Sequence, residues 1–265
     1  MKMDIRKGAA NGYSADGDTV LREIEEAALA FDRVRDRLWV QLVGRSNPLV
    51  QSEKYPYKKV EGIDLVTIYR VREEYGKPYR GDPVVDNAML RKWRVDPHCL
   101  DWIALKSTMR QMPVRITTLN DLFRKDIKTV APEEMYCESG MDYILTNPEI
   151  SYGAVTFQYP GVLQALAENS GSDLYLLPFS PHAVAVRRAD SGTEVKKLQH
   201  LLLIINTTKE PPGEILSNHI YRYDGKEQKL SCATTEEETE EMLKEVLAGR
   251  ERLSEQEKLD EELER

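Results

Sequence analysis

The segment GSDLYLLPFSPHAVAV, residues 171–186, holds two apolar runs joined by a turn that contains two prolines. The runs DLYLL and AVAVRR are apolar and partly β-branched, a composition typical of buried strands. Pro178 and Pro181 favour a rigid connection between them. The segment therefore predicts a strand pair, with Ser180 and His182 in its turn.

Related patterns lie on both sides of this pair. Upstream, the strand-like runs DYILT (142–146) and YGAVTFQY (152–159) precede a helix that Pro160 opens and Gly171 ends. Downstream, we expect Thr193 to cap an amphipathic helix. The sequence thus contains two strand–strand–helix units in a row.

The run HIYRYDGKEQKL, residues 219–230, carries the Asp-Gly pair of a two-residue type I′ turn and predicts a β-hairpin. Two strand–strand–helix units followed by a hairpin predict an α+β fold. We expect a mostly antiparallel sheet with its helices on one face.

The N-terminal half mixes helices and strands. A helix is predicted from Asp18, capped by Asp18 or Thr19. Strands LWVQLVG (38–44) and GIDLVTIYRV (62–71) follow, and then two short helices, the second with Asp96 as its N-cap. The stripe expected to dock the first helix comprises Val20, Ile24, Ala27, Ala28, Phe31 and Val34. The predicted divisions are a flexible lead-in (1–17), an N-terminal helix and strand region (18–135), an α+β core (136–233) and an acidic helical tail (234–265).

The net charge of −8 lies in the tail. Residues 234–265 hold 13 of the 45 acidic residues and 5 of the 37 basic ones, so the body is neutral. A neutral body makes direct nucleic-acid binding an unfavoured function. Thr234 and Thr235, followed three residues later by Glu237 and Glu238, form a capping-box pattern that begins a helix. We expect its first half to dock on the body and its far end to be frayed and solvated.

Composition points to an ordinary globular protein. The chain has 265 residues, 41% of them apolar and 31% charged, enough to bury a sizeable core. No apolar run approaches the roughly 20 residues that cross a bilayer. The three cysteines form no CxxC pair, and the N-terminus lacks the apolar segment of a signal peptide. These features predict a cytoplasmic protein that binds no membrane.

Ser180 and His182 are the candidate catalytic residues. A nucleophilic serine needs a base within hydrogen-bond reach and a third group that orients the base. Two residues apart on an extended strand, they would lie about 6.6 Å from each other, and a tight turn would bring them closer. A structural turn, with the histidine bound to backbone carbonyls, explains the same residues equally well.

No strong catalytic signature accompanies this pair. The P-loop, dinucleotide-binding, zinc-protease and nucleophile-elbow motifs are absent, so we expect no metal site and no cofactor. Polar residues around the paired strands would offer hydroxyl and amide groups to a ligand if they lined one groove, although ordinary sheet residues fit the same pattern. These candidate binding residues are Tyr143, Asn147, Tyr152, Tyr159 and Tyr175, joined by Glu237, Glu238 and Glu241 of the tail.

Several segments together resemble a bacterial domain-of-unknown-function family, number 5688. They are YGKPYRGDPVVDNAML, YILTN, YGAVTFQYPGVLQALAE, SDLYLLPFSPHAV and INTTKEPPGEILSNHIYRYD. The resemblance runs from about residue 38 to 230. Relatives often read LPSSxHE in the proline turn, where this chain has Phe179 and Ala183, departures that weigh against catalysis. The resemblance implies a bacterial cytosolic protein, largely of gut Gram-positive bacteria and often with mobile-element neighbours, and it implies no activity.

The function favoured by these observations is binding to another macromolecule. The acidic tail fits a protein partner with a basic, nucleic-acid-binding surface, as in an accessory protein of a bacterium, phage or mobile element that inhibits a nuclease or defence complex in the manner of an anti-CRISPR. The alternatives are a hydrolase or transferase using Ser180 and His182, and a small-molecule sensor using the tyrosine-rich strands.

Overall fold

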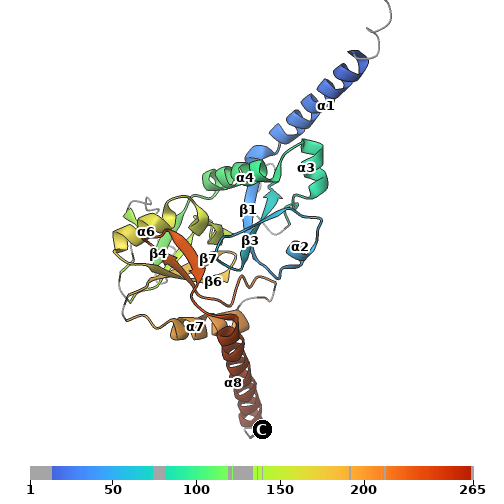
Figure 1. Ribbon diagram of the computed structural model, residues 1–265. Helices are drawn as coiled ribbons and strands as arrows, with labels where there is room; N and C mark the ends of the chain where they lie inside the picture. Colours follow the sequence, from blue (N-terminus) through green and yellow to red (C-terminus); the bar gives the residue numbers. More distant parts are fainter. Residues whose placement is uncertain are drawn as a thin grey trace, which may run out of the picture.

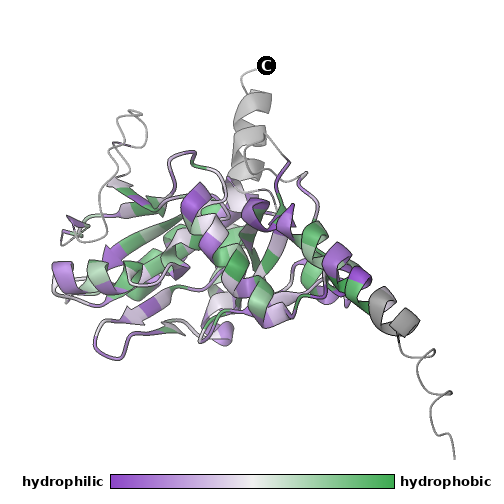
Figure 2. Cartoon of the chain, turned by 90° about the horizontal axis from the view of Figure 1, so that it is seen from above, coloured by the Kyte–Doolittle hydropathy of each residue, from purple (hydrophilic) through white to green (hydrophobic). Residues whose placement is uncertain are grey.

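A computed structural model describes residues 14–73, 81–118, 121, 134–135, 137–138, 140–190, 192–209, 211 and 213–263, with side chains described between 19 and 252. The described chain forms two antiparallel sheets surrounded by helices (Figure 1). Apolar residues concentrate in the helices and strands of the body, and hydrophilic residues in its outer loops (Figure 2). The predicted α+β class is confirmed.

The smaller sheet comes from the N-terminal half. Its order is β1–β3–β2, with β1 spanning Leu38–Gly44, β3 spanning Leu65–Val71 and β2 spanning Tyr57–Lys59. Every residue of β1 and β3 is buried, because both faces of this sheet are covered. One face joins the main core, and the other packs on the short helix α2, Pro48–Gln51.

The larger sheet has six strands in the order β4–β5–β7–β6–β8–β9, all neighbouring pairs antiparallel. The predicted pair of residues 171–186 lies near its centre as β6 and β7. The bounds are Arg115–Thr118 for β4, Tyr143–Thr146 for β5, Leu174–Ser180 for β6, Ala183–Arg188 for β7, Tyr221–Asp224 for β8 and Lys229–Cys232 for β9.

Helices cover both faces of this larger sheet, whereas one helical face was expected. On one face Leu176 and Val184 join the main core beneath α6, Val162–Ser170. On the other face Leu177 packs with α7, Val195–Thr208. The central strands carry apolar side chains at consecutive positions, and because successive side chains point to opposite faces, both faces need cover.

The remaining helices frame the body. They are α1 (Ser14–Asp32), the 3-10 turn η1 (Arg35–Arg37), α3 (Asn87–Trp93), α4 (Pro97–Gln111) and α8 (Glu236–Leu263), with α1 and α8 projecting from opposite ends in Figure 1. Asp96 caps α4 as predicted, its carboxylate accepting from the His98 amide. In contrast, α1 begins before Asp18, and Val20 of the predicted docking stripe is 45% exposed.

Three local predictions are wrong. Residues 152–159 form the 3-10 helix η3, Gly153–Gln158, instead of a strand. The β8–β9 hairpin pairs Asp224 with Lys229 and so has a four-residue connection in place of the two-residue type I′ turn. Thr193 does not cap α7, because its hydroxyl hydrogen bonds to Arg188 and Asp190.

The tail helix α8 begins as the sequence predicts. The Thr235 hydroxyl accepts from the Glu238 amide at 3.2 Å, and the Glu238 carboxylate accepts from the Thr235 amide at the same distance. Its first half docks on α7, where Gln199 donates to buried Thr239 at 2.7 Å and Val246 is buried. The helix continues to Leu263, so the backbone of its far end is helical where fraying was expected.

The main core draws on both the N-terminal and the C-terminal halves. It includes Leu42 from the smaller sheet, Leu100 from α4, and Leu145 and Tyr221 from the larger sheet. The Tyr221 hydroxyl donates to Asp64 beside β3 at 2.6 Å, which ties the two sheets together. Among the described helices, none combines the length and the apolar character needed to cross a membrane.

Candidate functional site

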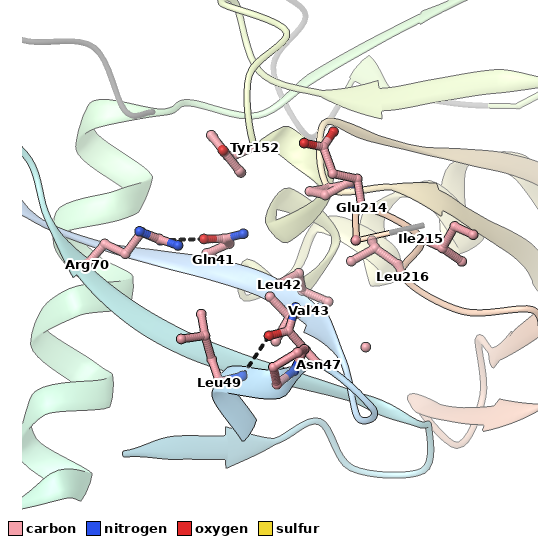
Figure 3. A pocket seen from close by; sticks show the side chains of 14 residues that line it. Gln41, Leu42, Val43, Asn47, Leu49, Arg70, Tyr152, Glu214, Ile215 and Leu216 are labelled. Carbon is pink, nitrogen blue, oxygen red and sulfur yellow. Dashed lines mark hydrogen bonds between the residues drawn. The ribbon is translucent and has the colours of Figure 1, made fainter. Parts of the chain in front are cut away.

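A pocket of about 250 Å³ opens between the edge of β1 and the segment of residues 213–216 (Figure 3). Gln41 and Arg70 contribute from the smaller sheet, and Tyr152 and Glu214 lie across the strands from Leu49 of α2. The two sheets and their connecting loops meet here. The pocket is therefore built from residues far apart in the sequence.

β1 forms one wall of the pocket, and it is an edge strand. Hydrogen bonds to the β3 side occur just beyond its two ends: the Arg37 carbonyl accepts from Arg72, and the Arg45 amide donates to Asp64. In an antiparallel pair, hydrogen-bonded and non-hydrogen-bonded positions alternate. The even-numbered residues between Arg37 and Arg45 therefore turn their N–H and C=O groups away from β3.

Helix α4 covers the first half of this outward edge. The Val40 amide donates to the Thr108 hydroxyl at 2.9 Å, and the Gln111 side chain donates to the Leu38 carbonyl at 3.0 Å. Leu42 is the next outward residue, and its N–H and C=O make no hydrogen bond with any described residue. Leu42 lines the pocket while its side chain packs in the main core, so we infer that its backbone groups face the pocket.

Arg70 supplies a buried charge beside the pocket. Its guanidinium donates to the side chain of Gln41 and to the carbonyl of Asp82. The Trp39 indole donates to the Asp82 carboxylate at 2.8 Å, and the Arg70 guanidinium lies 6.0 Å from the Trp39 ring centroid. The protein itself thus holds the Arg70 guanidinium in place, as a buried charge requires.

Tyr152 lines the opposite side of the pocket and belongs to an aromatic stack. The Tyr152 ring lies between the rings of Trp39 and His182. Its centroid is 5.0 Å from that of Trp39 and 5.1 Å from that of His182. The Tyr152 amide donates to Nδ1 of His182 at 3.1 Å, so this nitrogen acts as an acceptor. Nε2 of His182 lies 3.6 Å from the Glu214 carboxylate. The histidine thus connects the stack to the acidic side chain at the pocket.

Ser180 and His182 lie close together in the structure, but the Ser180 hydroxyl makes no hydrogen bond with the imidazole ring of His182. Ser180 is buried at the end of β6, and its Oγ accepts from the His182 amide at 3.1 Å. The His182 side chain is 37% exposed, and its ring interacts with Tyr152 and Glu214. A nucleophile must share a hydrogen bond with its base, so this arrangement favours a structural role for Ser180.

The other candidate residues are spread over several surroundings. Tyr143 packs against the main core and Tyr175 against the cluster on the opposite sheet face. Tyr159 is buried and donates to the Met112 carbonyl at 2.8 Å, and burial raises its pKa. Asn147 is fully buried, where its side chain bonds residues of its own turn. Only Tyr152 of this set lines the pocket.

The acidic candidates Glu237, Glu238 and Glu241 lie exposed on the first turns of α8. Hydrogen bonds from Thr235 lower the pKa of Glu238. Glu238 is thus part of the helix cap, while Glu237 and Glu241 present their charges to solvent. These exposed carboxylates can contact a partner, but they do not form an enclosed binding site.

Sequence reasoning missed Glu214, Gln41 and Arg70, because nothing in their local sequence indicates a shared pocket. It also missed a second Ser-x-His pair, Ser217 and His219. The His219 amide donates to the Ser217 hydroxyl at 3.0 Å, the same geometry as the first pair. The shared S-x-H pattern is a signal for this turn, and its recurrence in a second turn supports the structural reading of Ser180.

Two comparisons with known proteins give no match: no curated protein and no solved structure is similar to the chain. A protein-family model does match, over residues 5–225, and its description is family of unknown function, DUF5688. The match covers the smaller sheet, the larger sheet except β9, and every residue that lines the pocket, and it confirms the resemblance noted in the sequence.

Proposed function

We propose that this chain, which belongs to the DUF5688 family, works by binding another protein, and that the β1-edge pocket takes an extended segment of that partner. The observation that carries the proposal is the outward-facing N–H and C=O of Leu42 at the pocket wall. An unpaired strand edge is a template for a further strand.

An extended peptide matches this wall better than a compact ligand does. It offers one N–H and one C=O per residue, and strand addition uses these groups for affinity and side-chain pockets for specificity. The outward groups of Val40 and Leu38 are already bonded to α4. The added segment would therefore lie beside Leu42, between α4 at one end and the Leu216 backbone, which packs against Gly44, at the other.

The charge beside the pocket selects a basic side chain. Arg70 is engaged by Gln41 and Asp82, so the group that meets a ligand from the opposite wall is the Glu214 carboxylate, with 24% of its side chain exposed. A Lys or Arg of the bound segment would make a charge-assisted hydrogen bond with this carboxylate.

The acidic face of α8 extends the same preference over a larger surface. Glu237 and Glu241 are exposed, while the helix docks through Thr239 and Val246. Opposite charges over such a surface speed association and make it sensitive to salt. The proposed partner is thus a basic protein, such as a nuclease or defence complex. The cytoplasmic, bacterial and mobile-element setting belongs to the same proposal.

Peptide selection tests the pocket directly. A random heptapeptide library is selected against the full chain, and the enriched peptides are synthesised and titrated by fluorescence anisotropy. We expect Lys or Arg in the enriched peptides, and about tenfold weaker binding by Glu214→Gln, the loss expected for a charged hydrogen bond. The matched control is Glu61→Gln, which removes an exposed carboxylate outside the pocket.

A blocking variant locates the binding surface. Leu49 is half-buried and lines the pocket, so Leu49→Trp should fill it and abolish peptide binding while circular dichroism stays unchanged. Enriched peptides that bind Leu49→Trp as tightly as the wild type would overturn the proposal, as would a selection with no enrichment over an albumin control.

A further inference from the structure

A second pocket, of about 630 Å³, lies around α2 and β2 and shares no lining residue with the β1-edge pocket. Its wall is the segment from Gln51 to Tyr57, with Arg45, Lys59 and Asn87 around it. The volume falls within the range of small-ligand sites, roughly 300–1,000 Å³. The residues that line it are mostly polar or aromatic.

Two exposed cations, Arg45 and Lys59, line this pocket. Among the described residues, no carboxylate lies within ion-pair distance of Arg45 or Lys59. The neighbouring lysines do form ion pairs. The Lys58 ammonium lies 2.6 Å from the Asp101 carboxylate, and the Lys54 ammonium lies 3.9 Å from the Asp86 carboxylate. Arg45 and Lys59 are therefore available to an anion.

Glu53 is the one carboxylate that lines the described part of this pocket, and it is exposed. Its backbone carbonyl accepts from the Asn87 side chain at 2.7 Å, which fixes the loop against the start of α3. Two lining cations against one carboxylate leave the pocket with a net positive charge.

Aromatic side chains line the same pocket as these cations. Tyr55 and Tyr57 line the pocket on either side of Pro56, and Tyr57 is 43% exposed although it is a large ring. The Lys54 ammonium lies 5.2 Å from the centroid of the Tyr55 ring. An exposed tyrosine ring and cations that line the same pocket are the combination that stacks a base and holds its phosphate.

We propose that this pocket binds a nucleotide, with Arg45 and Lys59 on the phosphate and the Tyr57 ring against the base. A phosphate alone would use the two cations and leave the tyrosines without a role. A nucleoside alone would leave the two cations without one. A nucleotide satisfies both sets, either as a free molecule or as the terminal unit of an oligonucleotide.

Calorimetric titration of the full chain tests the site with AMP, adenosine and inorganic phosphate as separate probes. We expect AMP to bind with a Kd below about 1 mM, and adenosine and phosphate to bind at least about tenfold more weakly. Lys59→Gln and Tyr57→Ala change exposed side chains, so the fold should persist, and each should weaken AMP binding by about tenfold. Lys209→Gln, an exposed lysine elsewhere, is the control and should bind as the wild type does.

A thymidine tetranucleotide with a 5′ phosphate tests whether the ligand is a free nucleotide or the end of an oligonucleotide. Tighter binding than AMP, lost in Lys59→Gln, supports the site and assigns it to an oligonucleotide end, and binding equal to AMP assigns it to a free nucleotide. Absence of AMP binding in the millimolar range, or equal binding by Lys59→Gln and the wild type, would overturn the inference. Neither result depends on the β1-edge pocket, whose peptide ligand is tested separately.

Discussion

Gly153 fixes the wall of the β1-edge pocket because no side chain fits at its position. A Cβ there would lie 2.4 Å from the Thr146 hydroxyl, 2.6 Å from the Asn147 amide and 2.9 Å from the His182 carbonyl. Two of these are backbone atoms, which cannot turn aside. This close approach places Tyr152 next to the His182 turn and so holds the aromatic stack in position.

We therefore expect Gly153→Ala to lower the free energy of unfolding by about 1–3 kcal/mol, the usual cost of overpacking. Urea denaturation followed by circular dichroism measures the change. The variant should also lose affinity for peptides selected on the wild type, because the Tyr152 wall moves. An unchanged denaturation midpoint would contradict the tight packing described here.

Ser180 and His182 show how far single residues can be interpreted from sequence. Their proximity could be predicted because they are two positions apart. The hydroxyl's real partner, the His182 amide, is a backbone group of the same turn, which the structural alternative anticipated. Glu214 could not be predicted, since it reaches His182 only through the three-dimensional arrangement of the loops.

At the scale of elements, helix α8 offers a matched contrast with Gly153. Gly249 lies inside this helix, and a Cβ there would meet no atom within 4 Å. Gly249→Ala should therefore stabilise the protein by about 0.5–1 kcal/mol, because alanine has the better helix propensity and nothing opposes it. The measurement is the same urea titration. A lower urea midpoint for Gly249→Ala would contradict this account, because it would show that other residues pack against α8 at Gly249.

Most elements could be predicted from local patterns, and the exceptions have physical causes. The run 152–159 contains alternating and β-branched residues that favour a strand. However, Tyr152 adopts a left-handed conformation with φ of 53° and residues 153–157 are all buried. The close approach of Gly153 to Thr146, Asn147 and His182 is a tertiary contact, which no local pattern predicts.

At the scale of the whole molecule, buried cysteine and tyrosine side chains make the free energy of unfolding depend on pH in the alkaline range. Burial raises the pKa of Cys137 to about 12 and raises the pKa of Tyr159 and Tyr221 above the usual value. In the unfolded chain these groups lose their protons near pH 9 and 10. The unfolded state then binds fewer protons than the native state, so the free energy of unfolding falls as pH rises.

Tyr159→Phe should reduce this alkaline loss. Removal of one titrating group lessens the slope above pH 10 by as much as about 1.4 kcal/mol per pH unit, although the lost hydrogen bond to Met112 costs about 1 kcal/mol at neutral pH. Urea midpoints between pH 8 and 11.5 measure the slope. Tyr57→Phe, which changes an exposed tyrosine, serves as the control. A slope equal to that of the wild type would contradict the assignment.

The packing of the whole molecule was the least predictable level. The sequence predicted an antiparallel sheet with helices on one face, yet the apolar residues of β6 and β7 point to both faces and require α6 and α7 on opposite sides. The union of the two sheets depends on contacts such as Tyr221 with Asp64. These residues are far apart in the chain, and no local pattern relates them.

Amide hydrogen exchange at Leu42, followed by NMR with and without a selected peptide, tests the strand-addition claim most directly. The Val40 amide is bonded to Thr108 and should exchange slowly in both states. The Leu42 amide should exchange faster in the free protein and slow at least about tenfold when the peptide binds, because the added strand supplies its missing acceptor. Tight peptide binding without slower exchange at Leu42 would contradict strand addition at this edge.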